Sequence, residues 1–236
     1  FNAALAEARV GTFESAFKIL SAALNKFPDE FEVASTTVSL ALTHGELDTA
    51  ARVLEQVQAK WPRTATLLSL QGTLKERQGD LPGAIAAHEA AVAIDPTDKG
   101  LRELSRLQAF SNQPQKAMDS ACRALDVAPG QTASIYNLAW PEVEAGDFPA
   151  ARAHFAQTLT DPKLACDSLR MLSQLPGEET GLDVPTMADT LRSAAQTNTD
   201  KGHLDMARYH AARSSHPDTA LSLLVSANKH YAKDRH

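Results

Sequence analysis

The hexapeptide GDLPGA at residues 79–84 recurs along the chain as a pattern of glycine, large apolar residue and alanine. Three further copies of Gly-x-[Leu/Phe]-x-x-Ala are GTFESA (11–16), GELDTA (45–50) and GDFPAA (146–151). A fifth copy, NQPQKA at residues 112–117, begins with asparagine in place of glycine. The alanines of the five copies stand at 16, 50, 84, 117 and 151, so the steps are 34, 34, 33 and 34 residues. Repeats of this length indicate a solenoid of stacked helical units.

A series of prolines has the same period and supports the repeat independently. Its members are Pro28, Pro62, Pro96, Pro129 and Pro162, spaced by 34, 34, 33 and 33 residues. Each proline follows the alanine of its copy by 11 or 12 residues. Because proline lacks an N–H and cannot continue a helix, each one is expected to close a helical unit.

Each recurring element of the pattern has a physical reason. Glycine or asparagine can adopt the positive φ that ends one helix and turns the chain tightly. Alanine in the first turn of the next helix lets the two backbones approach, since a larger side chain would hold them apart. Each repeat is therefore expected to be a pair of helices joined by a tight turn.

This pattern of turn glycine, small residue and closing proline resembles that of the tetratricopeptide-repeat (TPR) family over residues 1–162. The resemblance implies an all-α superhelical solenoid of antiparallel helix pairs, in which the first helix of each pair lines a concave face that binds protein partners. We expect five regular pairs in residues 1–162 and two degenerate pairs in 163–236, with an irregular loop around 175–184. The expected helices of the degenerate part are 163–174, 185–197, 201–213 and 217–233.

The remaining prolines test this assignment. Pro82, Pro114, Pro149 and Pro217 fall in the first turn of an expected second helix, where the missing N–H costs little. Pro141 is the exception, because it lies inside an expected helix.

Composition excludes several other classes of protein and partner. Aromatic residues are only 6% of the chain and alanine is frequent, which favours closely packed helices over a β-sandwich. The net charge is −6 with both signs interspersed, so we expect neither nucleic acid nor an anionic membrane as a partner. No run approaches the roughly 18 apolar residues that span a bilayer, so membrane insertion is not expected.

A cytoplasmic location is expected, because no signal peptide is visible. The chain opens on Phe1 in mid-pattern, however, so a lost export signal keeps the periplasm open as an alternative. Cys122 and Cys166 lie in separate helical segments, and we expect both to be buried as small apolar residues.

Motifs for chemistry are absent from the sequence. There is no GxxxxGK[ST], GxSxG, HExxH or CxxC segment. His203 and His210 are seven residues apart on one expected helix, but no third metal ligand accompanies them. We therefore expect no catalytic residue, no metal site and no cofactor, so that this chain is not itself an enzyme.

Candidate partner-binding residues can be found by counting back from each turn along the first helix of a pair. The fourth pair gives Lys99, Arg102 and Arg106, whose spacing places them on one helix face. The fifth pair gives Tyr136, Asn137 and Trp140, and the second and third pairs give Ser35, Ser39, Ser69 and Thr73. Together they predict a groove for a protein or peptide, with the cations favouring an acidic or carboxylate-ended segment.

A second interpretation of these residues stays open. The cations can form an ordinary solvated face on which Glu103 neutralises the arginines, and Trp140 can be part of the core. Pro141 favours the binding interpretation, because it removes a backbone hydrogen bond and can kink its helix to open the groove.

The C-terminal part resembles the segment that joins the repeats to the catalytic domain in bacterial TPR-sulfotransferase fusions. The resemblance rests on Leu204, Ala207 and Ala211, followed by residues 220–224 and Asn228-Lys229. It implies, as an alternative function, the substrate-recognition region of a sulfotransferase whose catalytic domain lies outside this chain.

Overall fold

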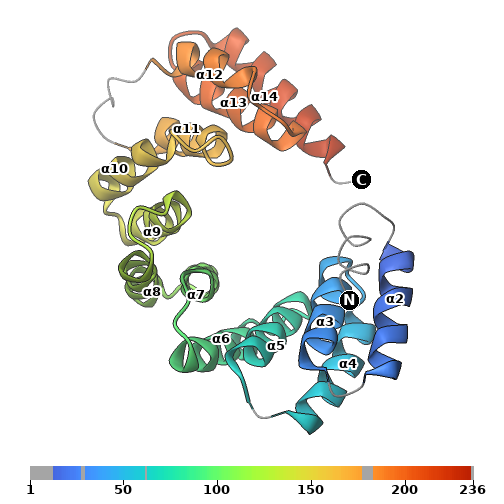
Figure 1. Ribbon diagram of the computed structural model, residues 1–236. Helices are drawn as coiled ribbons and strands as arrows, with labels where there is room; N and C mark the ends of the chain where they lie inside the picture. Colours follow the sequence, from blue (N-terminus) through green and yellow to red (C-terminus); the bar gives the residue numbers. More distant parts are fainter. Residues whose placement is uncertain (1–12, 28–29, 62, 177–182, 235–236) are drawn as a thin grey trace. The chain divides into compact units, whose positions relative to one another are not determined.

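The computed structural model describes residues 13–27, 30–61, 63–176 and 183–234. These residues form thirteen helices and contain no strand, as the repeat pattern predicts. The chain divides into two compact units, residues 1–112 and 113–236, which are described separately (Figure 1). The first helix of the first predicted pair and its turn at Gly11 lie outside the described residues.

The first unit contains six of the described helices, each packed against its neighbours in the chain. Direct contacts join α2 to α3, α3 to α4, α4 to α5, α5 to α6 and α6 to α7, and α3 also packs on α5. The helices are α2 (Phe13–Lys26), α3 (Phe31–Thr43), α4 (Leu47–Lys60), α5 (Ala65–Arg77), α6 (Leu81–Ile94) and α7 (Asp98–Phe110).

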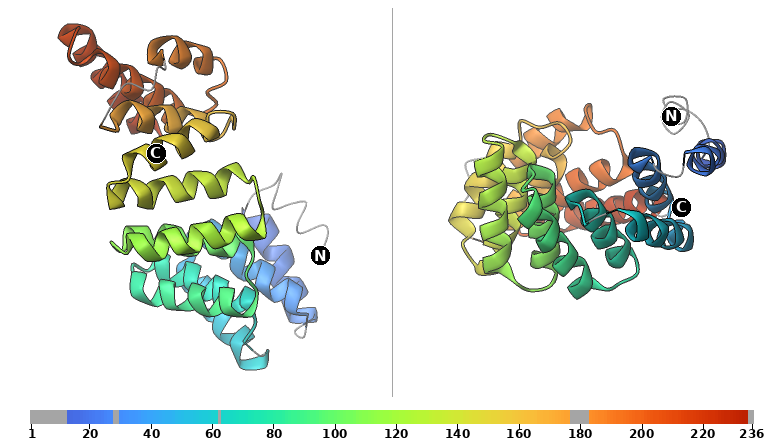
Figure 2. Two further views of the ribbon diagram at one scale, coloured as in Figure 1. Left: turned by 90° about the vertical axis from the view of Figure 1, so that its left-hand side faces the viewer. Right: turned by 60° about the horizontal axis from the view of Figure 1, so that its bottom comes forward.

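The second unit contains the other seven described helices, and Figure 2 shows them from two further directions. Successive helices again pack on one another, and α11 packs on α13 as well as on α12. The helices are α8 (Pro114–Val127), α9 (Thr132–Ala145), α10 (Phe148–Thr158), α11 (Ala165–Gln174), α12 (Val184–Arg192), α13 (Asn198–Ala212) and α14 (Pro217–Lys233).

The turns between paired helices have the predicted backbone conformation. Gly45, Gly79 and Gly146 have φ values of 79°, 84° and 81°, in the left-handed region that glycine adopts without strain. Asn112 replaces glycine in the copy at residues 112–117 and has φ 57°. It is the one non-glycine residue with positive φ in the described part of the chain. The substitution therefore keeps the turn, because asparagine tolerates this conformation better than most residues.

The repeat alanines are buried, as expected where paired helices approach closely. All five, at positions 16, 50, 84, 117 and 151, are fully buried. The predicted prolines open their helices, since Pro82, Pro114, Pro149 and Pro217 lie in the first turn of α6, α8, α10 and α14. Pro141 lies inside α9, as its position in the sequence predicts.

Two expectations about the second unit were wrong in detail. The helix expected at 185–197 ends at Arg192, and Thr197, the last residue expected in it, is instead the N-cap residue of α13. Thr197 and Asp200 form a reciprocal capping box, which moves the start of α13 to Asn198. Cys166 is buried as expected, whereas Cys122 is exposed, because it lies on a face of α8 that its neighbours do not cover.

Candidate functional site

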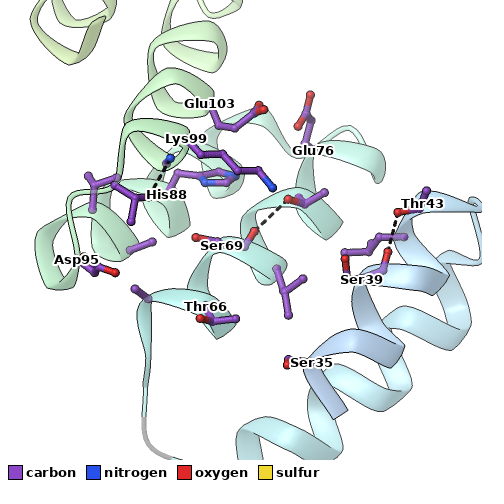
Figure 3. A pocket seen from close by; sticks show the side chains of 18 of the residues that line it. Ser35, Ser39, Thr43, Thr66, Ser69, Glu76, His88, Asp95, Lys99 and Glu103 are labelled. Atoms are coloured by element: carbon purple, nitrogen blue, oxygen red, sulfur yellow. Dashed lines mark hydrogen bonds between the residues drawn. The ribbon is translucent and has the colours of Figure 1, made fainter. Parts of the chain in front are cut away.

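The first unit contains a pocket of about 660 Å³, within the range of roughly 300–1,000 Å³ that ligand sites occupy. Residues from α3, α5 and α7 form its walls, and the C-terminal half of α6 contributes His88, Ala91 and Val92 (Figure 3). This arrangement follows from the packing: α3 packs on α5, whereas α7 packs on α6. One face of α6 therefore reaches the pocket between α5 and α7.

Hydroxyl side chains line the α3 and α5 walls. Ser35, Ser39, Ser69 and Thr73, which the turn positions predict for the groove, all line the pocket. The Thr73 hydroxyl donates to the Ser69 carbonyl at 3.0 Å, and the Ser35 hydroxyl donates to a carbonyl of its own helix at 3.2 Å. Each of these hydroxyl oxygens keeps lone pairs that can accept a further hydrogen bond.

Arg106 lies at the α7 wall and forms ion pairs with two carboxylates. Its Nη2 lies 2.8 Å and 2.9 Å from the two carboxylate oxygens of Glu76 on α5. Its Nε and Nη2 also lie 3.0 Å and 2.9 Å from Oε2 of Glu103. Burial alone would lower the pKa of Arg106, but the two carboxylates outweigh that effect and the pKa is raised. Arg106 therefore links α5 to α7 across the pocket.

The other two predicted cations, Lys99 and Arg102, differ from Arg106 in the ion pairs described for them. Lys99 is exposed, lines the pocket and has no ion pair described for it. Arg102 is half-buried, and its Nε donates to Asp98 Oδ2 at 3.1 Å, one turn earlier on α7. Arg102 does not belong to the described pocket lining.

Tyr136, Asn137 and Trp140 belong to the second unit and are all half-buried on α9. The rings of Tyr136 and Trp140 make edge contacts with Phe155, at centroid distances of 5.6 Å and 6.0 Å. The Tyr136 hydroxyl donates to the carboxylate of Asp167, and burial is the main cause of its raised pKa. The six predicted residues are thus divided between the two units, and their combination into one binding site stays a prediction.

His88 is a pocket residue that the sequence patterns did not predict; it lies in the lining on α6 and is only 3% exposed. Its ring occupies space that Gly72 on α5 leaves open, because a Cβ at Gly72 would lie 2.5 Å from the imidazole. The repeat register contains a signal for this residue. His88 lies four residues after the repeat alanine, where the other repeats have the buried apolar residues Leu20, Leu54, Ala121 and Phe155.

No group of three or more His, Cys, Asp or Glu side chains among the described residues could hold a metal ion. No described helix combines the length and apolarity required to cross a membrane.

Comparison with known proteins agrees with the helical repeat. The family model described as "Tetratricopeptide repeat" matches residues 36–99, a segment that includes α4, α5, α6 and most of α3. No curated protein sequence is significantly similar to the chain.

Several solved structures share the fold at low sequence identity. PilW, described as a widely conserved type IV pilus biogenesis factor, aligns with a TM-score of 0.67 and 17% identity over 94% of this chain and 96% of that chain. A tetratricopeptide repeat protein from Parabacteroides merdae aligns with a TM-score of 0.65 and 14% identity over 96% of both chains. YrrB, described as a TPR protein with an unusual peptide-binding site, aligns with a TM-score of 0.54 and 15% identity over 70% of this chain and 87% of that chain. At these identities the comparison shows the fold alone.

Proposed function

The chain is a tetratricopeptide-repeat protein, and we propose that it is a binding scaffold that holds a peptide segment of a partner protein in the pocket of its first unit. The observation that carries this proposal is the pocket itself, whose walls come from α3, α5 and α7, the first helices of three successive predicted pairs. These helices line the binding face in solenoids of this kind. YrrB, whose description mentions a peptide-binding site, has the same fold.

The chemistry of the lining fits a peptide. Three cationic residues, Arg77, Lys99 and Arg106, are matched by three anionic ones, Glu76, Asp95 and Glu103. Serine and threonine hydroxyls supply further donors and acceptors for peptide amide and carbonyl groups. Such a lining favours hydrogen bonding over attraction to a highly charged ligand, and Lys99 supplies the contact for an acidic side chain if the partner has one.

A selection from random dodecapeptides displayed on phage tests the proposal, followed by fluorescence anisotropy with the recovered peptide. Ser69→Phe places a ring in the pocket and should weaken binding by about tenfold or more, equivalent to about 1.4 kcal/mol. Gln58→Phe is the matched control, because Gln58 is exposed on α4 of the same unit and outside the pocket lining. The proposal fails if no peptide is recovered, or if Ser69→Phe binds as tightly as the Gln58→Phe control.

The larger site predicted from the sequence is a separate proposal, in which Lys99, Arg102, Arg106, Tyr136, Asn137 and Trp140 all contact the partner. Its test is the Arg102→Ala variant, which should weaken binding of the recovered peptide without loss of helicity. Arg106→Ala serves the same purpose only if its stability is measured too, since Arg106 also links α5 to α7 through Glu76. Unchanged affinity in both variants would exclude the arginines from the site.

The alternative function, as the recognition region of a TPR-sulfotransferase, rests on the resemblance of residues 204–229 alone. The described residues contain no strand that could carry a phosphosulfate-binding loop. No contact in the described structure favours this alternative over a protein-binding scaffold.

A further inference from the structure

His88 is a buried histidine in a position where the fold elsewhere uses apolar residues. Its counterparts Leu54 and Phe155 are 3% and 0% exposed and fill the space between paired helices. An apolar side chain at position 88 would do the same. The imidazole therefore calls for a reason other than packing, because a sequence usually departs from its own pattern where function requires it.

Neither ring nitrogen of His88 has a hydrogen-bond partner among the described residues of the protein, and both nitrogens are shielded from solvent. A buried polar group left without a partner costs about 1–3 kcal/mol. Such groups are uncommon in folded proteins, and each calls for an explanation. Figure 3 shows the imidazole on the pocket side of α6, and His88 is among the residues that line the pocket. A ligand that displaces the side chains covering the ring can therefore supply the missing partner.

The neighbouring helix makes room for this ring at a cost. Gly72 lies inside α5, where glycine is about 1 kcal/mol less favourable than alanine. Any side chain at position 72 would collide with the imidazole, since a Cβ there would lie 2.5 Å from Cδ2 and 2.6 Å from Nε2. Nε2 therefore faces α5, and Nδ1 is the nitrogen left for a ligand. Gly72 thus leaves the space that the imidazole fills, and the contact holds the ring in the pocket lining.

The charges around His88 indicate which ligand group fits. Burial lowers its pKa, and the neighbouring carboxylates of Glu103 and Glu76 and the guanidinium of Arg106 act on it in opposite directions. A neutral imidazole has one N–H donor and one acceptor nitrogen. A carboxamide or hydroxyl can both donate and accept, whereas a carboxylate can only accept and would lie near two further carboxylates.

We propose that His88 is the specificity-determining residue of the pocket, and that it selects partner peptides by hydrogen bonding to the side chain of asparagine, glutamine, serine or threonine. This inference rests on the proposed function and adds the chemical class of the residue that is recognised. A site that hydrogen-bonds a ligand group discriminates strongly against a ligand that lacks it, because the polar group of the site is then left unpaired.

The experiment uses oriented libraries of N-acetylated nonapeptide amides. The central residue is fixed in each library as Asn, Gln, Ser, Thr, Leu, Glu or Lys, and the other positions are equimolar mixtures. Binding is measured to the wild-type chain, to His88→Phe and to His88→Gln. The phenyl ring copies the apolar residue found in the fifth repeat, whereas the carboxamide of His88→Gln keeps a donor and an acceptor.

The wild-type chain should prefer the Asn, Gln, Ser or Thr libraries to the Leu and Glu libraries by about tenfold or more. His88→Phe should lose this preference while unfolding at the same or a higher urea concentration, and His88→Gln should retain part of the preference. The inference is overturned if His88→Phe keeps the wild-type preference, or if the wild-type chain binds all libraries equally. If the wild-type chain binds none of them, the proposed peptide-binding function fails as well.

Discussion

The close approach of Gly72 to His88 makes a quantitative prediction about stability. In Gly72→Ala the new methyl group would lie 2.5 Å from a ring carbon of His88, so the ring or its helix must shift. Overpacking of this kind costs about 1–3 kcal/mol. Alanine gains about 1 kcal/mol over glycine inside a helix. The net expectation for Gly72→Ala is therefore a loss of about 0–2 kcal/mol in the free energy of unfolding.

The effect of Gly72→Ala on the free energy of unfolding should change sign when the imidazole is absent. In the His88→Ala background no ring opposes the methyl group, so Gly72→Ala should stabilise the chain by about 1 kcal/mol. The coupling energy between the two positions is then about 1–3 kcal/mol, as expected for residues in direct contact. Urea unfolding followed by circular dichroism measures all four members of the cycle. Gly72→Ala having the same effect in both backgrounds would refute the packing of glycine against imidazole.

Three further predictions concern other features of the fold. Because burial lowers the pKa of His88 from 6.5, the unfolded chain binds its proton more readily, and the free energy of unfolding should fall as the pH drops below about 6.5. Urea unfolding at pH 7.5 and 5.5 should show a smaller fall in the free energy of unfolding for His88→Phe than for wild type. An equal fall in both would contradict a contribution of His88 to the pH dependence. Phe155→Ala should lose about 3–5 kcal/mol by the same assay, since this ring is fully buried against Tyr136 and Trp140, and a loss below about 1 kcal/mol would contradict that packing. Asn112→Ala should lose about 1 kcal/mol because its φ is 57°, whereas Asn112→Gly should stay close to wild type; equal losses would mean that the turn does not require this conformation.

The helices and turns could be predicted from the sequence because their causes are local and repeated. A glycine such as Gly79 needs only its own backbone to adopt a positive φ, and Pro82 needs only its place in the first turn of α6. Each feature recurs every 33 or 34 residues, so the copies confirm one another. Where the period is lost, the sequence predicts less: the helix expected at 185–197 ends at Arg192, and the Thr197–Asp200 capping box that starts α13 has no counterpart in the repeat pattern.

The pocket could be predicted only in part, because its shape depends on contacts between helices. Turn counting identifies Ser39 and Ser69 as groove positions, since that rule uses helix geometry alone. The same rule does not predict that α6 contributes to the pocket lining, because that contribution depends on how α7 packs on α6. The ion pair between Arg106 and Glu76 joins residues 30 apart, and no spacing rule within one helix reveals it.

The ion pairs of Arg106 also change which residue should determine any preference for acidic partners. A ligand carboxylate that approaches Arg106 must compete with Glu76 and Glu103, which already accept its hydrogen bonds. Removing Arg106 would leave both carboxylates without this partner, so a loss of binding in Arg106→Ala would combine changes in contact and in stability. Lys99 lines the same pocket, is exposed and has no ion pair described for it. An acidic side chain of the partner should therefore bind at Lys99, and Lys99→Ala is the variant whose effect on affinity reports charge recognition directly.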